Sequence, residues 1–223
     1  MQTLDSVNNY WNKQYEYLWD KKFFFKNQPK YSEHGEDRII EMIFNKIKPV
    51  NKWFVDVGCA YKGSSNTWSL IEKDWSGLLI DADENPINEV RGLIRENNKV
   101  RALNTFITPN NLDKVLYDQN VPEVIDFLSI DTDSYEYEIW KNLEKFKPNM
   151  VCIEVNQGNI GDFKTIDYDP SASLYKYSKK RKSNWNGATT GLMNKLAEEK
   201  GYDYLCWIVS NVFYIKRSFI NAS

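Results

Sequence analysis

The stretch from Lys52 to Trp68 constrains the fold of this chain more than any other. It reads KWFVDVGCAYKGSSNTW. It begins with an apolar run of β-forming residues, continues through a turn of small residues from Gly58 to Ser65, and then takes on helical periodicity. A buried strand, a side-chain-poor turn and a helix start make up one half of a nucleotide-binding βαβ unit. Small turns let a ligand approach the backbone and helix N-termini attract polar groups, so we expect a cofactor to bind here.

Apolar runs alternate with runs of helical periodicity along the rest of the chain. Strands are expected at 52–57, 77–81, 99–104, 125–130 and 149–153, helices at 36–48, 66–73, 84–94, 112–117, 137–146 and 187–200, and a closing hairpin at 202–209 and 212–215. This alternation is typical of a mostly parallel sheet with helices on both faces. The sequence therefore predicts an α/β fold.

Four of the expected strands, at 52–57, 77–81, 125–130 and 149–153, end in polar residues. Parallel strands present their carboxyl ends at one rim of the sheet, and ligands bind outside that rim. Asp81 ends the second strand about 20 residues after Gly58, which is the spacing of an acid that accepts hydrogen bonds from ribose hydroxyls. An exposed strand end can carry an aspartate for other reasons, but spacing and context together favour ribose binding.

Acidic residues dominate the rim after the later strands. Asp131 and Asp133 follow the strand at 125–130, and Glu154 ends the strand at 149–153. Such acids suit metal ligation by hard oxygens or general-base work. A helix N-terminus also favours aspartate, which explains one of the acids better than two. His34, the only histidine, is a second candidate base, although a lone histidine is more often a surface or capping residue.

The two segments outside this pattern are the N-terminus and a late loop. Residues 1–31 are rich in aromatics and are expected to form one or two helices ending near Pro29, with Trp11, Tyr15 and Trp19 on one face. Simple packing on the domain is the favoured interpretation, and a lid or a homodimer surface is the alternative. Residues 157–186 form a long excursion with a basic run at 179–182, which is either a solvated loop or a clamp for an anionic substrate such as a nucleotide sugar.

Composition narrows the class of protein. The chain is 42% apolar and 27% charged, as is ordinary for a globular protein, and its net charge of −2 gives no basic field for nucleic acid. Its three cysteines, Cys59, Cys152 and Cys206, are dispersed, which indicates a reducing compartment and hence a cytoplasmic location. No signal-peptide pattern opens the sequence and no apolar run approaches 18 residues, so we expect no membrane span.

Together these motifs resemble class I S-adenosylmethionine-dependent methyltransferases and, more narrowly, the FkbM-type family. The segments that carry the resemblance are His34–Asp37, Phe54–Gly58, Ser65–Thr67, Trp75–Asp81, Phe127–Asp133, Ile153–Asn156 and the pair Gly187–Thr189 and Asn211–Ile215. The resemblance covers about 32–217, which leaves 1–31 as an N-terminal cover and 218–223 as a tail. It implies a Rossmann-like α/β sandwich whose seven-stranded, mostly parallel sheet has the order 3-2-1-4-5-7-6, with an antiparallel strand in the C-terminal hairpin.

The resemblance also implies an activity and a site. The activity is methyl transfer from S-adenosylmethionine to a hydroxyl of a sugar, as a nucleotide sugar or a surface glycan. The cofactor residues would be Asp56, Gly58, Cys59, Ala60, Asn66, Thr67, Asp81, Ala82 and Asp83, and the substrate residues Tyr135, Asn156, Lys180 and Arg181. Asp131, Asp133, Glu154 and His34 would serve in catalysis. The acids are similar to those of magnesium-dependent macrocin-type sugar O-methyltransferases, so Asp131 and Glu154 would hold Mg²⁺ or another divalent cation.

The sequence differs from these families at two places, and two other functions remain as alternatives. The turn reads Gly58-Cys-Ala60 in place of Gly-x-Gly, and alanine disfavours a positive φ. The macrocin type has two adjacent acids where this chain has Glu154-Val155. An N-methyltransferase acting on a small molecule or protein, and a non-catalytic nucleotide- or carbohydrate-binding module, are the alternatives. A dehydrogenase fits less well, because the turn matches the dinucleotide fingerprint poorly.

Overall fold

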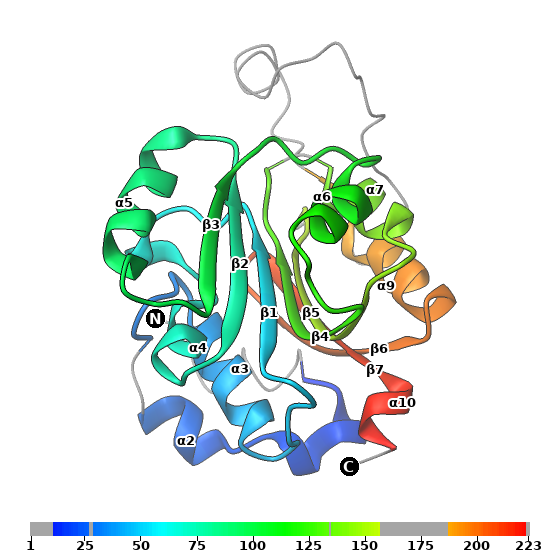
Figure 1. The fold of residues 1–223 in the computed structure, drawn as a ribbon. Helices are drawn as coiled ribbons and strands as arrows, with labels where there is room; N and C mark the ends of the chain where they lie inside the picture. The colour runs from blue at the N-terminus through cyan, green and yellow to red at the C-terminus, as the bar shows by residue number, and fades with distance from the viewer. Residues whose placement is uncertain (1–10, 27–28, 134, 157–186, 222–223) are drawn as a thin grey trace.

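A seven-stranded sheet forms the centre of the protein (Figure 1). The computed structural model describes residues 11–26, 29–133, 135–156 and 187–221. The strands are β1 (Trp53–Val57), β2 (Ser76–Asp81), β3 (Val100–Asn104), β4 (Val124–Ile130), β5 (Lys147–Glu154), β6 (Tyr202–Ile208) and β7 (Asn211–Lys216). Their order in the sheet is β3-β2-β1-β4-β5-β7-β6, with β7 antiparallel to both β5 and β6. The predicted fold class and strand order are confirmed.

Helices cover both faces of the sheet (Figure 1). They are η1 (Lys13–Leu18), α2 (Lys21–Lys26), α3 (Glu36–Phe44), η2 (Lys62–Ser64), α4 (Trp68–Glu72), α5 (Glu84–Ile94), α6 (Leu112–Asp118), α7 (Glu136–Asn142), α9 (Thr190–Glu199) and α10 (Arg217–Ile220). One apolar core joins α2, α3, α4 and α5 to one face, and a second joins α6, α7 and α9 to the other. Among the described residues, no helix is long and apolar enough to cross a membrane.

The sheet brings the predicted polar strand ends together. β1 lies between β2 and β4, and all three run parallel, as β5 does beside β4. Strand alternation sends Phe54 and Asp56 toward the face covered by α3 and α4, and sends Val55 and Val57 toward the face covered by α6 and α7. The carboxyl ends of β1, β2, β4 and β5 therefore form one rim.

The N-terminal segment closes the outer edge of the sheet. Trp11 forms an antiparallel bridge with Cys206 of β6, and the Asn12 amide donates to the Leu205 carbonyl at 2.8 Å. The Trp11 ring stacks on Trp19 at 4.6 Å between ring centroids. The expected single helical face is thus wrong for Trp11, which lies before the helix. Pairing with β6 satisfies edge groups that an open strand would leave unpaired.

A buried carboxylate fixes the turn before β1, at the end of the sheet opposite the rim. Asp126 of β4 is fully buried and accepts hydrogen bonds from the backbone amides of Val50, Asn51 and Lys52 at 2.7–2.8 Å. These bonds hold the turn that leads into β1, and they satisfy a charge that would otherwise be costly to bury. An acid inside an apolar run gives no such signal in the sequence, because its partners come from another segment.

Candidate functional site

The turn after β1 is packed tightly against the end of β4. Gly58 has a φ of 81°, and a Cβ added there would lie 1.6 Å from the Asp131 carbonyl oxygen. The backbone amides of Gly58 and Cys59 both donate to the Ile80 carbonyl, at 2.8 and 3.1 Å. Positive φ and the approach of a backbone carbonyl both exclude a side chain. Gly58 is therefore required to place Asp131 beside the turn.

Asp81 completes the same turn from the end of β2. Ala60 adopts a φ of 47°, and its amide donates to the Asp81 carboxylate at 3.1 Å. The other carboxylate oxygen accepts from the Asp83 amide at 2.8 Å. The left-handed conformation costs a residue with a Cβ about 1 kcal/mol, which the bond to a charged acceptor offsets. The chain thus keeps the tight turn with alanine in the position where glycine was expected.

Exposed groups suitable for a nucleoside surround Asp81. Ala82 and Asp83 are exposed, and the ring of Phe106, which follows β3, is 36% exposed. The Thr105 amide donates to the Asp81 carbonyl at 2.9 Å, so the ends of β2 and β3 lie together. A half-exposed carboxylate can accept from ribose hydroxyls, and an accessible aromatic ring can pack on a base. The residues at this end of the sheet therefore fit S-adenosylmethionine.

Beneath the turn lies a buried polar network. Asp56 accepts a hydrogen bond from the Thr67 hydroxyl at 2.7 Å and a longer one from the Ser65 hydroxyl at 3.4 Å. The Asn66 amide donates to the Ser129 hydroxyl at 3.2 Å. Asp56, Asn66 and Thr67, expected to line the cofactor site, are buried and bonded inside the protein. The two serines were not predicted, because a serine in a strand or turn has no distinctive spacing.

Replacing Asp56 with asparagine is expected to remove a pH dependence of stability. Burial raises the pKa of Asp56 from 3.8 to about 6, against the lowering effect of hydrogen bonds from Thr67, Ser129 and Ser65. Folding therefore favours the protonated carboxyl, and its stabilisation is complete below about pH 4 and lost as the pH rises through 6. Relative to Asp56→Asn, wild type should lose roughly 2–3 kcal/mol between pH 4 and pH 8. Urea unfolding in EDTA measures this, and a wild type that keeps or gains stability relative to Asp56→Asn as the pH rises would contradict the assignment.

Three acids converge at the rim, as the sequence indicated. Oxygen atoms of Asp131, Asp133 and Glu154 all lie within 4.8 Å of one another. Asp131 and Glu154 are hydrogen-bonded to each other. Burial, followed by the charges of neighbouring carboxylates, raises the pKa of both Asp131 and Glu154. Two carboxyl groups that cannot both ionise cheaply either share a proton or take up a cation.

Glu136, at the start of α7, adds a fourth carboxylate. It is fully buried and accepts hydrogen bonds from the Thr132 amide at 2.9 Å and the Thr132 hydroxyl at 2.7 Å. Its charge contributes to the raised pKa values of both Asp131 and Glu154. Glu136 thereby holds the segment between Asp131 and Asp133 in place. This role was not predicted from the sequence, because an acid in a first helical turn is ordinarily exposed.

The donor set of the rim fits a hard divalent cation. Asp131, Asp133 and Glu154 each offer a carboxylate oxygen, and Mg²⁺ and Ca²⁺ prefer oxygen ligands. Four nearby acids also concentrate negative charge that a cation would neutralise. The end of β5 reads Glu154-Val155-Asn156. It therefore provides one acid, where the macrocin type has two adjacent acids.

His34 lies on a segment that is tied to the rim. Its ring is exposed, with Nε2 4.0 Å from a carboxylate oxygen of Glu33, and its backbone amide donates to the buried Glu36 at 3.0 Å. Glu36 also accepts from the Asn211 side chain at 3.1 Å. Asn211 pairs with Glu154 in the sheet. The structure therefore anchors the segment of His34 to the strand beside the acids.

The predicted substrate residues have different surroundings. Tyr135 is 3% exposed and packs in the core under α7. Asn156 is half-buried, and its amide donates to the Ala188 carbonyl at 2.8 Å, which joins the end of β5 to the segment before α9. Lys180 and Arg181, together with the rest of the excursion 157–186, lie outside the described residues.

Comparison with known proteins agrees with this architecture. Residues 105–204, a little under half of the chain, match the family model described as the methyltransferase FkbM domain. A putative caffeoyl-CoA O-methyltransferase from Staphylococcus aureus is 16% identical with a TM-score of 0.54, covering 92% of this chain and 93% of its own. The N-terminal domain of EvdMO1, solved with SAH bound, is 11% identical with a TM-score of 0.52, covering 84% and 82%. No curated protein matches the sequence significantly.

The sheet order and the family match together define the class of protein. The chain is an S-adenosylmethionine-dependent methyltransferase with the Rossmann-like class I fold. The match to the FkbM methyltransferase domain covers residues 105–204, which run from just after β3 into β6. The predicted enzyme class and the resemblance to the FkbM type are confirmed.

Proposed function

We propose that this methyltransferase acts on a hydroxyl group of a sugar, presented as a nucleotide sugar or as part of a glycan. The observation that carries the proposal is the cluster of Asp131, Asp133 and Glu154 at the ends of β4 and β5. A sugar hydroxyl is a weak acid, so its methylation needs a base or a cation beside it. Amine acceptors need less help with deprotonation, and such a cluster would serve them little.

Each part of the site has a role in this proposal. S-adenosylmethionine, when bound, supplies a methyl carbon activated by its sulfonium. Asp81 would accept hydrogen bonds from the ribose, and Phe106 would pack on the adenine. Asp131, paired with Glu154, takes the proton of the acceptor hydroxyl. A divalent cation held by these acids would instead lower the pKa of that hydroxyl. In both cases the protein mainly positions the acceptor and excludes competing water.

Two proteins of similar fold are associated with a sugar or with O-methylation. The EvdMO1 domain has also been solved in the presence of SAH and D-fucose, at 10% identity and a TM-score of 0.53. The protein from Staphylococcus aureus is described as an O-methyltransferase. At these identities the likeness extends to the fold alone, and the acidic rim is what favours a hydroxyl acceptor.

A methyl-transfer screen tests the proposed function. Purified protein is incubated with labelled S-adenosylmethionine and a panel of nucleotide sugars, glycans and amines, with Mg²⁺ or with EDTA. We expect label to enter at least one sugar acceptor and no amine. Loss of methyl transfer in EDTA would mean that the acids at the rim hold a divalent cation. Unchanged transfer would mean that they remove the proton of the acceptor themselves. Label entering only amines would overturn the proposal in favour of an N-methyltransferase.

A further inference from the structure

A cavity lies at the end of the sheet opposite the acidic rim. It has a volume of about 130 Å³ and lies between α7, the start of β5 and the start of β6. Its walls include the edges of Trp140, Phe146 and Tyr202, which are themselves buried in the core. A cavity of this volume has room for several water molecules and hence for a small polyatomic ion.

Three lysines line this cavity: Lys147, Lys200 and Lys216. The Lys147 ammonium donates to the Glu144 carbonyl at 2.6 Å, and the Lys200 ammonium donates to the Leu143 carbonyl at 3.0 Å. Successive carbonyl groups of one loop thus hold the two ammonium groups near each other. Burial, and then the charge of Lys147, lowers the pKa of both Lys200 and Lys216. We call this cavity the lysine pocket.

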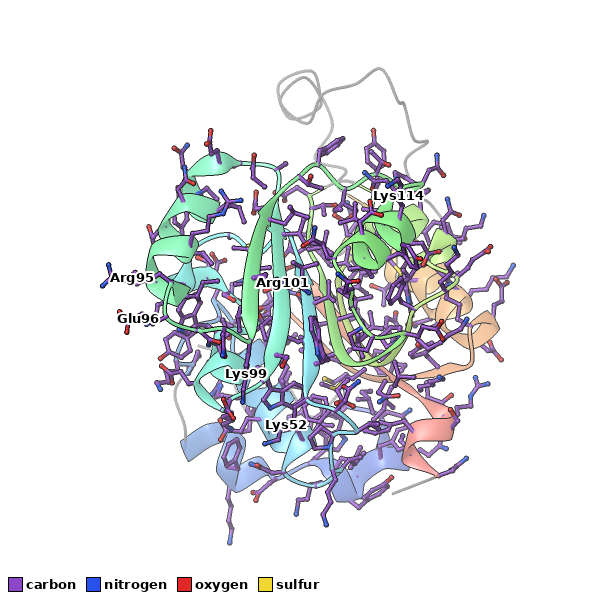
Figure 2. All side chains as sticks on the ribbon, in the orientation of Figure 1. Lys52, Arg95, Glu96, Lys99, Arg101 and Lys114 are labelled. Atoms are coloured by element: carbon purple, nitrogen blue, oxygen red, sulfur yellow. The ribbon has the colours of Figure 1, made fainter. Side chains whose placement is uncertain are left out.

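Within the described part of the chain, none of the three lysines forms an ion pair. Lysines elsewhere on the surface do, such as Lys99 with Asp74 and Lys114 with Asp118 (Figure 2 labels both lysines). The acids that influence Lys200 are Glu144, which is exposed, and Asp113.

The Asp113 carboxylate is already occupied by the backbone amides of Glu144 and Lys145, at 3.0 and 3.1 Å. Three cations are therefore gathered around one hollow, and among the described residues none of them pairs with a carboxylate, in a protein whose net charge is −2. Like charges held together in this way repel one another, and an anion of suitable size would relieve the repulsion.

The lysine pocket is remote from the site of methyl transfer. Lys147 begins β5 and Glu154 ends it. At about 3.3 Å per residue, the strand separates their backbones by roughly 23 Å. A ligand in the pocket therefore cannot be the acceptor hydroxyl in reach of Asp131.

We propose that the lysine pocket is a binding site for a phosphate group, either free phosphate or the phosphate of a phosphorylated sugar. Ammonium groups bind phosphate oxygens through short, charge-assisted hydrogen bonds. Lys147, Lys200 and Lys216 approach the anion from three different elements, which matches the three-dimensional distribution of its oxygens. The rings of Trp140 and Tyr202 bound the hollow and limit the size of any group attached to the phosphate.

Titration calorimetry with inorganic phosphate and with glucose 1-phosphate, at constant ionic strength set by sodium chloride, tests this proposal. We expect both to bind wild type. The variant Lys147→Gln should bind about tenfold more weakly and the double variant Lys147→Gln/Lys200→Gln about a hundredfold more weakly. Lys147 is exposed, so its single variant keeps the fold. Much tighter binding of glucose 1-phosphate identifies a phosphorylated sugar as the ligand, and equal binding identifies the phosphate group alone.

Lys99→Gln is the matched control. It makes the same change of charge on an exposed lysine beside β3, at the opposite edge of the sheet (Figure 2), and should change the affinity less than twofold. The proposal is wrong if neither anion binds wild type beyond the effect of chloride. It is also wrong if the double variant binds as tightly as wild type.

Discussion

Asp131→Asn and Glu154→Gln are each expected to lower the turnover of methyl transfer about a thousandfold, with S-adenosylmethionine affinity changed by less than about fivefold. Each substitution keeps the shape of the side chain and removes its ability to take a proton or hold a cation. The two carboxyl groups are hydrogen-bonded to each other and surrounded by Asp133 and Glu136, so neither can be replaced by a neighbour without rebuilding the rim. Steady-state rates and cofactor titration measure the two effects separately.

Glu96→Gln provides the control for this experiment. Glu96 has a side chain that is 85% exposed and projects from the protein just beyond α5 (Figure 2), and α5 follows β2, whereas the acids follow β4 and end β5. Its variant should turn over like wild type. If both rim variants retain wild-type turnover, the acids do not carry the chemistry, and proton removal must be assigned to another group or be unnecessary.

Gly58→Ala is expected to destabilise the protein by about 4 kcal/mol, which is a large part of the roughly 5–15 kcal/mol by which most domains are stable. A left-handed φ of 81° disfavours any side chain, and the new Cβ would overlap the Asp131 carbonyl oxygen at 1.6 Å. The backbone must move at the turn or at the end of β4. Either shift displaces Asp131, so any folded fraction should also be impaired in turnover. Urea unfolding followed by circular dichroism gives the stability.

Gly63→Ala, in the same turn, is the control for Gly58→Ala. It tests whether any added side chain in this turn destabilises the protein. An added Cβ at Gly63 meets no atom within 4 Å, and its φ is not in the left-handed region. We expect a change in stability within about 1 kcal/mol. Equal stabilities for the two variants would mean that the close approach between Gly58 and β4 does not hold in solution.

The sequence predicted the sheet because the signals for it are local. The strands are apolar runs that alternate with helical patterns, which predicts a mostly parallel sheet, and the order of the strands was implied by the family resemblance. The same logic placed Asp131, Asp133 and Glu154 at one rim, where the structure has them. Carboxyl ends of parallel strands meet whatever the details of packing, so such residues can be predicted without tertiary information.

Other features depend on contacts between distant segments and left no local signal. Trp11 pairs with β6, nearly 200 residues away, and so leaves the helix that its spacing suggested. Ala60 takes a positive φ because Asp81 holds its amide. Glu136 is buried because Thr132 binds it, and the lysine pocket arises only when β5 and β6 approach each other. In each case the conformation or burial of the residue is determined by the segment that it contacts, and its own residue type does not reveal it.

Titration calorimetry with S-adenosylmethionine and S-adenosylhomocysteine tests the central claim most directly, because the account requires the rim of β1 and β2 to hold this cofactor. One molecule of each should bind per chain. Asp81→Ala should weaken both by about tenfold or more, since the acid at the end of β2 is assigned to the ribose hydroxyls. Absence of binding to both ligands by wild-type protein would contradict the account and leave a module of this fold without methyltransferase activity.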